Sequence, residues 1–112
     1  MIANTEGYKN YFAAIFTSVL VATNETISEY EQTSQRMNEL AAQQPGFIGV
    51  ESARSELGIT VSYWESEESI RAWKHQSEHT LAREKGRSDW YRSFRLRVCR
   101  VEREYGFERD AE

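Results

Sequence analysis

The segment from residue 11 to residue 22 constrains the fold most, because it is apolar on both of its alternating sides. The two alternating sets are Phe12, Ala14, Phe16 and Leu20 on one side, and Ala13, Ile15 and Val19 on the other. β-branched and aromatic residues in this pattern favour a strand that is covered on both faces of its sheet. The segment is also far shorter than the ~20 apolar residues that a membrane-spanning helix needs.

The pattern becomes helical after this strand, from residue 25 to residue 43. Positions at helical spacing form one stripe of mostly apolar side chains: Ile27, Tyr30, Ser34, Met37, Leu40 and Ala41. The residues Thr26-Ile27-Ser28-Glu29 have the spacing of a capping box. We therefore predict an amphipathic helix that begins near Thr26 and buries one side.

A β-hairpin follows, because Pro45-Gly46 cannot continue a helix. We predict strands over residues 47–54 and 59–65, joined by a short turn at Leu57-Gly58. Ser66 then offers an N-cap for a second helix, in which Ile70, Trp73 and Ser77 recur at helical spacing and which Gly86 ends.

A last strand is predicted over residues 90–105, where Phe94, Leu96 and Val98 alternate and the phase then changes at Val101. The phase change suggests a β-bulge. Arginines at positions 92, 95, 97, 100 and 103 are interpreted as a solvated or salt-bridged edge, with an anion-binding patch as the alternative. Trp90 and Tyr91 are interpreted as structural anchors with a polar tip at the surface.

The element order is strand, helix, strand, strand, helix, strand, which predicts an α+β fold of the ferredoxin-like βαββαβ type with a four-stranded antiparallel sheet. Two helices cover only one face of such a sheet. Because the first strand is apolar on both sides, we expect a homodimer through the free sheet face. Each subunit would then form a dimeric α+β barrel with its partner and hold a small-molecule pocket between its sheet and its own helices.

Composition supports one domain over residues 1–112, with residues 1–10 as a flexible or loosely docked N-terminal segment. Hydrophobic residues make up 39% and charged residues 29% of the chain, as in a folded domain. The net charge of −4 gives no reason to expect nucleic acid or a membrane as a partner. A single cysteine, Cys99, and the lack of a signal-peptide pattern at the start indicate a cytoplasmic protein.

Two stretches carry a resemblance to a known family: Pro45-Gly46-Phe47-Ile48-Gly49-Val50-Glu51, and Tyr63-Trp64-Glu65-Ser66-Glu67-Glu68-Ser69-Ile70-Arg71-Ala72-Trp73. They resemble the antibiotic biosynthesis monooxygenase (ABM) family, and the similarity extends through His75, His79, Gly86-Arg87 and Trp90-Tyr91. The chain is similar to small single-domain members that are grouped with bacterial haem-degrading monooxygenases. The resemblance implies a dimeric α+β barrel, the architecture that the element order also predicts.

The resemblance further implies an oxygenase for a small aromatic or polyketide-like substrate, with no tightly bound cofactor. Such chemistry needs an apolar pocket, a base near the substrate hydroxyl, and donors that stabilise the resulting anion. His79 is the predicted catalytic base, because imidazole accepts a proton near neutral pH. The predicted substrate-binding residues are Trp64, Trp73, Tyr63, His75 and Phe16.

His75 and His79 can also be ordinary solvated or cap-forming histidines, and other assignments have a structural alternative as well. Tyr63 and Trp64 are adjacent in a strand and must face opposite sides of the sheet, which leaves open which one faces the pocket. Trp73 shares a stripe with Ile70, so it can equally pack in the core. Arg87 is a candidate partner for a carboxylate or phenolate, or else an ordinary surface arginine.

Haem binding or degradation is an alternative function. Haem-degrading relatives use an Asn in the first strand, a Trp in the second helix, and an axial His ten residues beyond it. Trp73 matches the tryptophan, whereas residues 14–17 hold no Asn and Arg83 stands at the axial position, leaving His75 or His79 as the ligand. The i, i+4 spacing of these two histidines lacks a third ligand, so we predict no metal site. A non-catalytic dimer that binds a small ligand is the remaining alternative.

Overall fold

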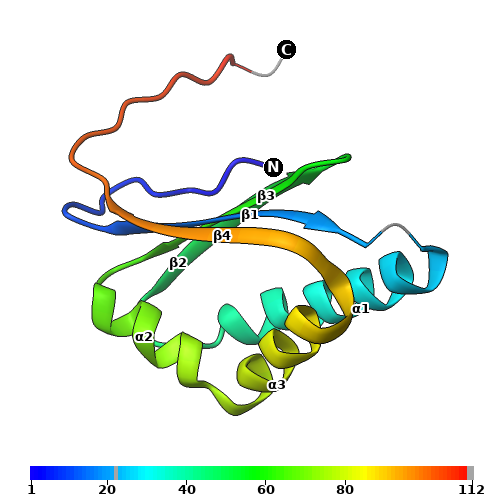
Figure 1. Cartoon of the computed structure of the whole chain (residues 1–112). Coiled ribbons are helices and arrows are strands. Elements are labelled where there is room, and N and C mark those ends of the chain that lie inside the picture. The colour runs from blue at the N-terminus through cyan, green and yellow to red at the C-terminus, as the bar shows by residue number, and fades with distance from the viewer. Residues whose placement is uncertain (22, 111–112) are drawn as a thin grey trace.

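The computed structural model describes residues 1–21 and 23–110, and in this part of the chain the elements follow the predicted order. The elements are β1 (Phe12–Leu20), α1 (Asn24–Ala41), β2 (Phe47–Arg54), β3 (Gly58–Trp64), α2 (Glu67–His75), α3 (Ser77–Lys85), the π-helical turn η1 (Gly86–Trp90) and β4 (Tyr91–Arg100). The strands form one antiparallel sheet in the order β2-β3-β1-β4. The helices all lie on one face of it (Figure 1). The ferredoxin-like α+β fold is therefore confirmed, while Ala22, the last residue of the predicted first strand, lies outside the described residues.

The register of β1 determines which side chains face the helices. Ala14 lies opposite Ser62 of β3 and Val98 of β4, whereas its neighbour Ala13 lies opposite Tyr63 and Cys99 on the other face. Ala13 and Ala14 are both buried, so this strand is covered on its two sides as its sequence predicts. The core on the helix side consists of Ala14, Ala41, Trp64 and Ile70.

The other face of the sheet is partly covered by the N-terminal segment, which crosses it on the side away from the helices (Figure 1). The backbone N–H of Ala3 donates to Oε1 of Glu51 at 3.2 Å, and the buried Thr5 hydroxyl donates to Oε2 of Glu104 at 2.7 Å. The exposed Ile59 shows that the cover is incomplete.

The start of α1 differs from the predicted capping box. Thr23 is the N-cap, and its Oγ1 accepts a hydrogen bond from the Thr26 backbone N–H at 3.1 Å. Thr26 already lies inside the helix, so the prediction of a cap at Thr26 is wrong by one turn. Glu29 therefore does not cap the helix, and its carboxylate contacts Trp90 and Lys85 instead.

The second predicted helix is two helices. The chain extends at Gln76 (φ −63°, ψ 135°), which ends α2 and begins α3. The Gln76 side chain then caps α3, since its Oε1 accepts from the His79 backbone N–H at 2.9 Å. The predicted N-cap of α2 is confirmed, because Ser66 Oγ accepts from the Ser69 N–H at 3.1 Å.

Gly46 explains how the chain turns from α1 into β2. Its φ of +83° is a left-handed conformation, and a Cβ there would clash with the Ser69 side chain. Only glycine allows both the conformation and the close approach of the α2 cap. Gly46 therefore also allows the start of α2 to lie close to the start of β2.

The last strand ends at Arg100, earlier than predicted. The pairing of β1 with β4 is regular from Ser93 to Arg100, so the predicted bulge before Val101 is wrong. The register shift lies instead at Val19/Leu20, where β4 begins. None of the helices in the described part of the chain is long and apolar enough to cross a membrane.

Candidate active site

A cavity of about 690 Å³ lies between the helix face of the sheet and the helices. The strands provide its largely apolar side, with the following side chains: Ala14, Phe16, Val50, Trp64, Leu96 and Val98. The helices provide the opposite side, and both sides contribute aromatic and polar groups. The pocket predicted between the sheet and the subunit's own helices is therefore present.

Three stacked rings form one wall of this cavity. The Trp64 indole is fully buried, and its Nε1 donates to Ser62 Oγ at 2.9 Å. Trp73 stacks on Trp64 with ring centroids 6.2 Å apart, and His79 stacks on Trp73 at 4.1 Å with planes 12° apart. An aromatic ligand that enters the cavity meets this wall.

The break at Gln76 places His79 in this stack. It leaves the Trp73 carbonyl, at the end of α2, free to accept hydrogen bonds from outside the helix. His79 Nδ1 lies 2.8 Å from that carbonyl oxygen. Since a carbonyl only accepts, Nδ1 carries the proton, and Nε2 of the neutral ring is the nitrogen with a free lone pair.

The electrostatic environment keeps this imidazole neutral. Burial lowers the pKa of His79, and the nearby positive charge of Arg83 lowers it further, while the Trp73 carbonyl opposes both effects. The ring is therefore an available base at neutral pH.

Two tyrosines lie at the other end of the cavity. Tyr30 of α1 and Tyr91 of β4 both line it, with ring centroids 5.7 Å apart. Burial, and then the neighbouring Tyr30, strongly raise the pKa of Tyr91, so its hydroxyl stays protonated. Arg54 lies over the Tyr30 ring at 4.9 Å and donates to its hydroxyl at 3.4 Å. The Arg54 guanidinium also donates to the buried Ser18 hydroxyl, which fixes it at this end of the sheet.

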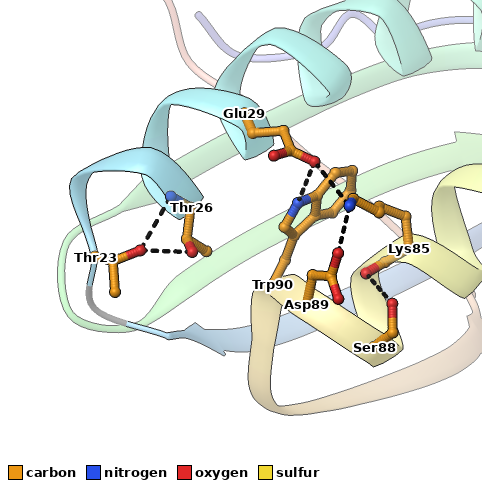
Figure 2. A network of polar contacts seen from close by, with 7 residues as sticks. All are labelled: Thr23, Thr26, Glu29, Lys85, Ser88, Asp89 and Trp90. Carbon is orange, nitrogen blue, oxygen red and sulfur yellow. Dashed lines mark hydrogen bonds and ion pairs between the residues drawn. The ribbon is translucent and has the colours of Figure 1, made fainter.

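Figure 2 shows how α1 is tied to the chain just before β4. Glu29 accepts from the Trp90 indole N–H at 3.2 Å and pairs with Lys85 Nζ at 3.4 Å. Lys85 also pairs with Asp89, and its carbonyl accepts from the Ser88 hydroxyl. This network fixes Trp90, and through it the position of Tyr91 in the cavity.

Of the residues predicted to bind substrate, Trp64, Trp73 and Phe16 line the cavity together with His79. Tyr63 does not, because alternation along β3 turns it to the opposite face, where its ring meets Tyr11 at 6.0 Å. Of the adjacent Tyr63 and Trp64, Trp64 is therefore the one that faces the pocket.

His75 is also outside the cavity. It ends α2 and is exposed, whereas His79 belongs to α3. The i, i+4 spacing of the two histidines would place them on one face of a continuous helix, but Gln76 interrupts the helix between them. Among the residues that the structure describes, no three His, Cys, Asp or Glu side chains are grouped closely enough to hold a metal ion.

The sequence interpretation did not assign Tyr30 and Tyr91 to the site. Tyr30 was recognised only as part of the buried stripe of the first helix, and Tyr91 as a surface anchor. Of the two predicted anchors, Trp90 is one, being buried with its indole N–H bonded to Glu29, whereas Tyr91 lines the cavity. The sequence signal that could have identified Tyr30 as a site residue is its hydroxyl, a polar group on the mostly apolar stripe of the first helix.

The fold and this cavity define an α+β protein with an aromatic-lined cavity, and comparison with known proteins gives the family. The model of the family described as "Antibiotic biosynthesis monooxygenase" (ABM) matches residues 19–85, more than half of the chain. The protein belongs to this family.

The chain is also similar to individual proteins. It is 50% identical over 100 residues to the uncharacterized protein YqjZ of Bacillus subtilis, covering 88% of this chain and 85% of that protein. Two solved structures share the fold at low identity. SnoaB, a cofactor-independent oxygenase from Streptomyces nogalater, has a TM-score of 0.72 at 13% identity, covering 85% of this chain and 96% of that one. Rv0793 from Mycobacterium tuberculosis has a TM-score of 0.74 at 11% identity, with 86% and 99% covered.

Proposed function

We propose that the protein is a cofactor-independent monooxygenase that oxidises a small polycyclic phenol, with His79 as the base. The observation that carries the proposal is a neutral imidazole, held through Nδ1 by the Trp73 carbonyl, in an aromatic cavity. Family membership and the fold shared with SnoaB support the same reaction class.

The reaction needs no other electron source. His79 Nε2 takes the proton of the phenol, and the resulting phenolate passes an electron to O₂. The two radicals combine at the ring carbon para to the oxygen, which forms a C–O bond. Loss of the para hydrogen as a proton, with cleavage of the O–O bond, yields the quinone and one water. The substrate and O₂ thus supply all atoms and electrons of the products.

Because the tyrosine pair lies at the end of the cavity away from His79, its hydrogen bonds are available to the reduced oxygen that adds at the para carbon and not to the phenolate oxygen beside His79. Because the pKa of Tyr91 is raised, its hydroxyl remains a donor at the pH where His79 is neutral. Fixed donors aimed at developing negative charge lower the barrier most effectively in a site that excludes water.

We further propose that the protein works as a homodimer through the sheet face away from the helices. Ile15 and Val61 are paired there at the centre of the sheet, and Ile59 is exposed. Light scattering coupled to size exclusion should give twice the mass of 13.1 kDa. Val61→Glu should give the monomer. A wild-type protein that is monomeric at micromolar concentration would contradict the proposal.

The function is tested with purified protein and 1,8-dihydroxyanthrone or 1-naphthol in an oxygen electrode. We expect protein-dependent oxygen uptake and a quinone that carries one atom from ¹⁸O₂. Heat-denatured protein gives the rate of uncatalysed oxidation. Binding of these phenols without uptake above that rate would instead support the alternative of a non-catalytic ligand-binding dimer.

Haem binding is a second candidate, favoured by the same histidine. Ligating histidines are typically held by a hydrogen bond from the other ring nitrogen, as Nδ1 of His79 is. Titration with haemin should then give a shifted Soret band that is lost in His79→Ala and kept in His75→Ala. An unshifted band would remove this candidate.

A further inference from the structure

The helix side of the cavity opening is basic. The lining includes four basic residues between the middle of α2 and η1, namely Arg71, Lys74, Arg83 and Arg87. Glu67 is the only acidic residue among the described residues that line the cavity. The chain as a whole has a net charge of −4, so this local excess of positive charge has the opposite sign to the net charge of the protein.

Three of these basic residues follow one another along the chain, at the end of α2, in α3 and in η1. Arg83 donates from Nη1 to the Lys74 carbonyl at 3.2 Å, which joins α3 to the end of α2. Arg87 follows one helical turn after Arg83, and its guanidinium lies 5.9 Å from the centre of the Phe94 ring. We refer to Lys74, Arg83 and Arg87 as the basic rim.

The basic rim is not neutralised by the chain. Within residues 1–21 and 23–110, the ion pairs involve Arg36, Lys85 and Arg71, and none includes a member of the rim. Even the Arg71–Glu67 pair is long, at 4.0 Å, and exposed. Cations that border a cleft with low-dielectric walls raise the local concentration of anions.

A neutral phenol would give the basic rim nothing to bind. We propose that the ligand of this cavity is an aromatic compound that carries an anionic group, a carboxylate or a phosphate, beside the ring that enters the pocket. Its rings lie against the stacked Trp73 and His79, and its anionic group is held by Lys74 and Arg87 at the opening. This inference deepens the proposed function, since it names the substrate class of the same site.

The test compares ligands that share one ring system. Binding of 2-naphthoate, 2-naphthyl phosphate and the neutral methyl 2-naphthoate is measured by tryptophan fluorescence or calorimetry at low and high salt. We expect at least one anion to bind about three- to tenfold more tightly than the ester, and the advantage to shrink in salt. The stronger of the two anions identifies carboxylate or phosphate. Equal or tighter binding of the ester would overturn the proposal.

A matched pair of variants assigns the effect to the rim. Lys74→Gln/Arg87→Gln removes two charges at the opening, and Lys9→Gln/Arg109→Gln removes two exposed charges elsewhere. Arg83 is left intact because it also joins α2 to α3. The first variant should lose the preference for the anion and keep the affinity for the ester, while the second keeps both. If the two variants behave alike, the basic rim is not the anion site.

This binding test is independent of oxygen chemistry. Selective anion binding without oxygen uptake would contradict the monooxygenase proposal and leave the ligand class standing. Oxygen uptake at equal rates with neutral and anionic phenols would contradict the proposed ligand class and support the monooxygenase proposal. The wild-type salt dependence gives an answer even where a variant is unstable.

Discussion

His79 and Trp73 contact each other twice although they belong to different helices. Their rings stack with centroids 4.1 Å apart, and Nδ1 of His79 lies 2.8 Å from the Trp73 carbonyl oxygen. In a continuous helix that carbonyl would accept from the backbone N–H of Ser77 instead. The interruption at Gln76 therefore creates the histidine's position, and with it the arrangement on which the proposed chemistry depends.

Removing the cap at Gln76 should disturb this position. Gln76→Ala loses the acceptor for the His79 N–H, and we expect a loss of about 1 kcal/mol in the free energy of unfolding. Gln76→Glu keeps an acceptor at the helix N-terminus and should stay close to wild type. Urea unfolding measures both, and the oxygenase rate should fall only in Gln76→Ala. Equal stability of the two variants would show that the cap is unimportant.

The lowered pKa of His79 predicts how the protein responds to acid. The unfolded chain binds a proton on this imidazole near pH 6.5, whereas the folded protein keeps it neutral to lower pH. The contribution of His79 to stability is thus complete above about pH 6.5 and is lost as the pH falls through the lower folded value. The loss of stability between pH 7.5 and 5 should be smaller in His79→Asn.

The matched control for the pH experiment is His75→Asn, which alters an exposed imidazole. It should show the wild-type dependence on pH. If His75→Asn and His79→Asn flatten the curve equally, the burial of His79 does not govern the response.

Gly86 allows Tyr91 to lie in the cavity. A Cβ at this position would lie 2.6 Å from Cε2 of Tyr91, although the backbone conformation is helical and suits any residue. Gly86→Ala should therefore cost about 1–3 kcal/mol, as overpacking does. Gly106→Ala has nothing within 4 Å and should change stability by no more than about 0.5 kcal/mol. Thermal unfolding of the pair distinguishes a packing effect from a general effect of alanine.

The two stacked tryptophans should differ in what they contribute. Trp64→Leu empties a fully buried position and should cost about 3 kcal/mol or more. Trp73→Leu changes a half-buried wall of the cavity and should cost less, while it weakens binding of an aromatic ligand. Chemical denaturation and ligand titration of both variants check this. A larger stability loss at Trp73 would place it in the core and not in the wall.

The sequence predicted the fold well because the periodicities are long and the turns are explicit. The apolar pattern of β1 and the Pro45-Gly46 turn were each correct in position. The site was predicted in part: Trp64, Trp73, Phe16 and His79 line one cavity as expected.

The errors around the second predicted helix have one physical cause, the break at Gln76. The i, i+4 spacing of His75 and His79 is read on the assumption of an unbroken helix, and Gln76 carries no helix-breaking signature of its own. Its extended backbone is stabilised by bonds that form only in the folded chain, such as the one from Arg83 to the Lys74 carbonyl. The basic rim could not be seen for the same reason, because the break decides which side of α3 faces the cavity.

The most direct test is the rate of oxygen uptake with 1,8-dihydroxyanthrone by wild type, His79→Asn and His75→Asn at pH 7.5. If His79 is the base, His79→Asn should lower kcat by a factor of about 10²–10⁴ without loss of fold, and His75→Asn should match wild type. A folded His79→Asn variant that consumes oxygen at the wild-type rate would contradict the assignment of His79 as the base.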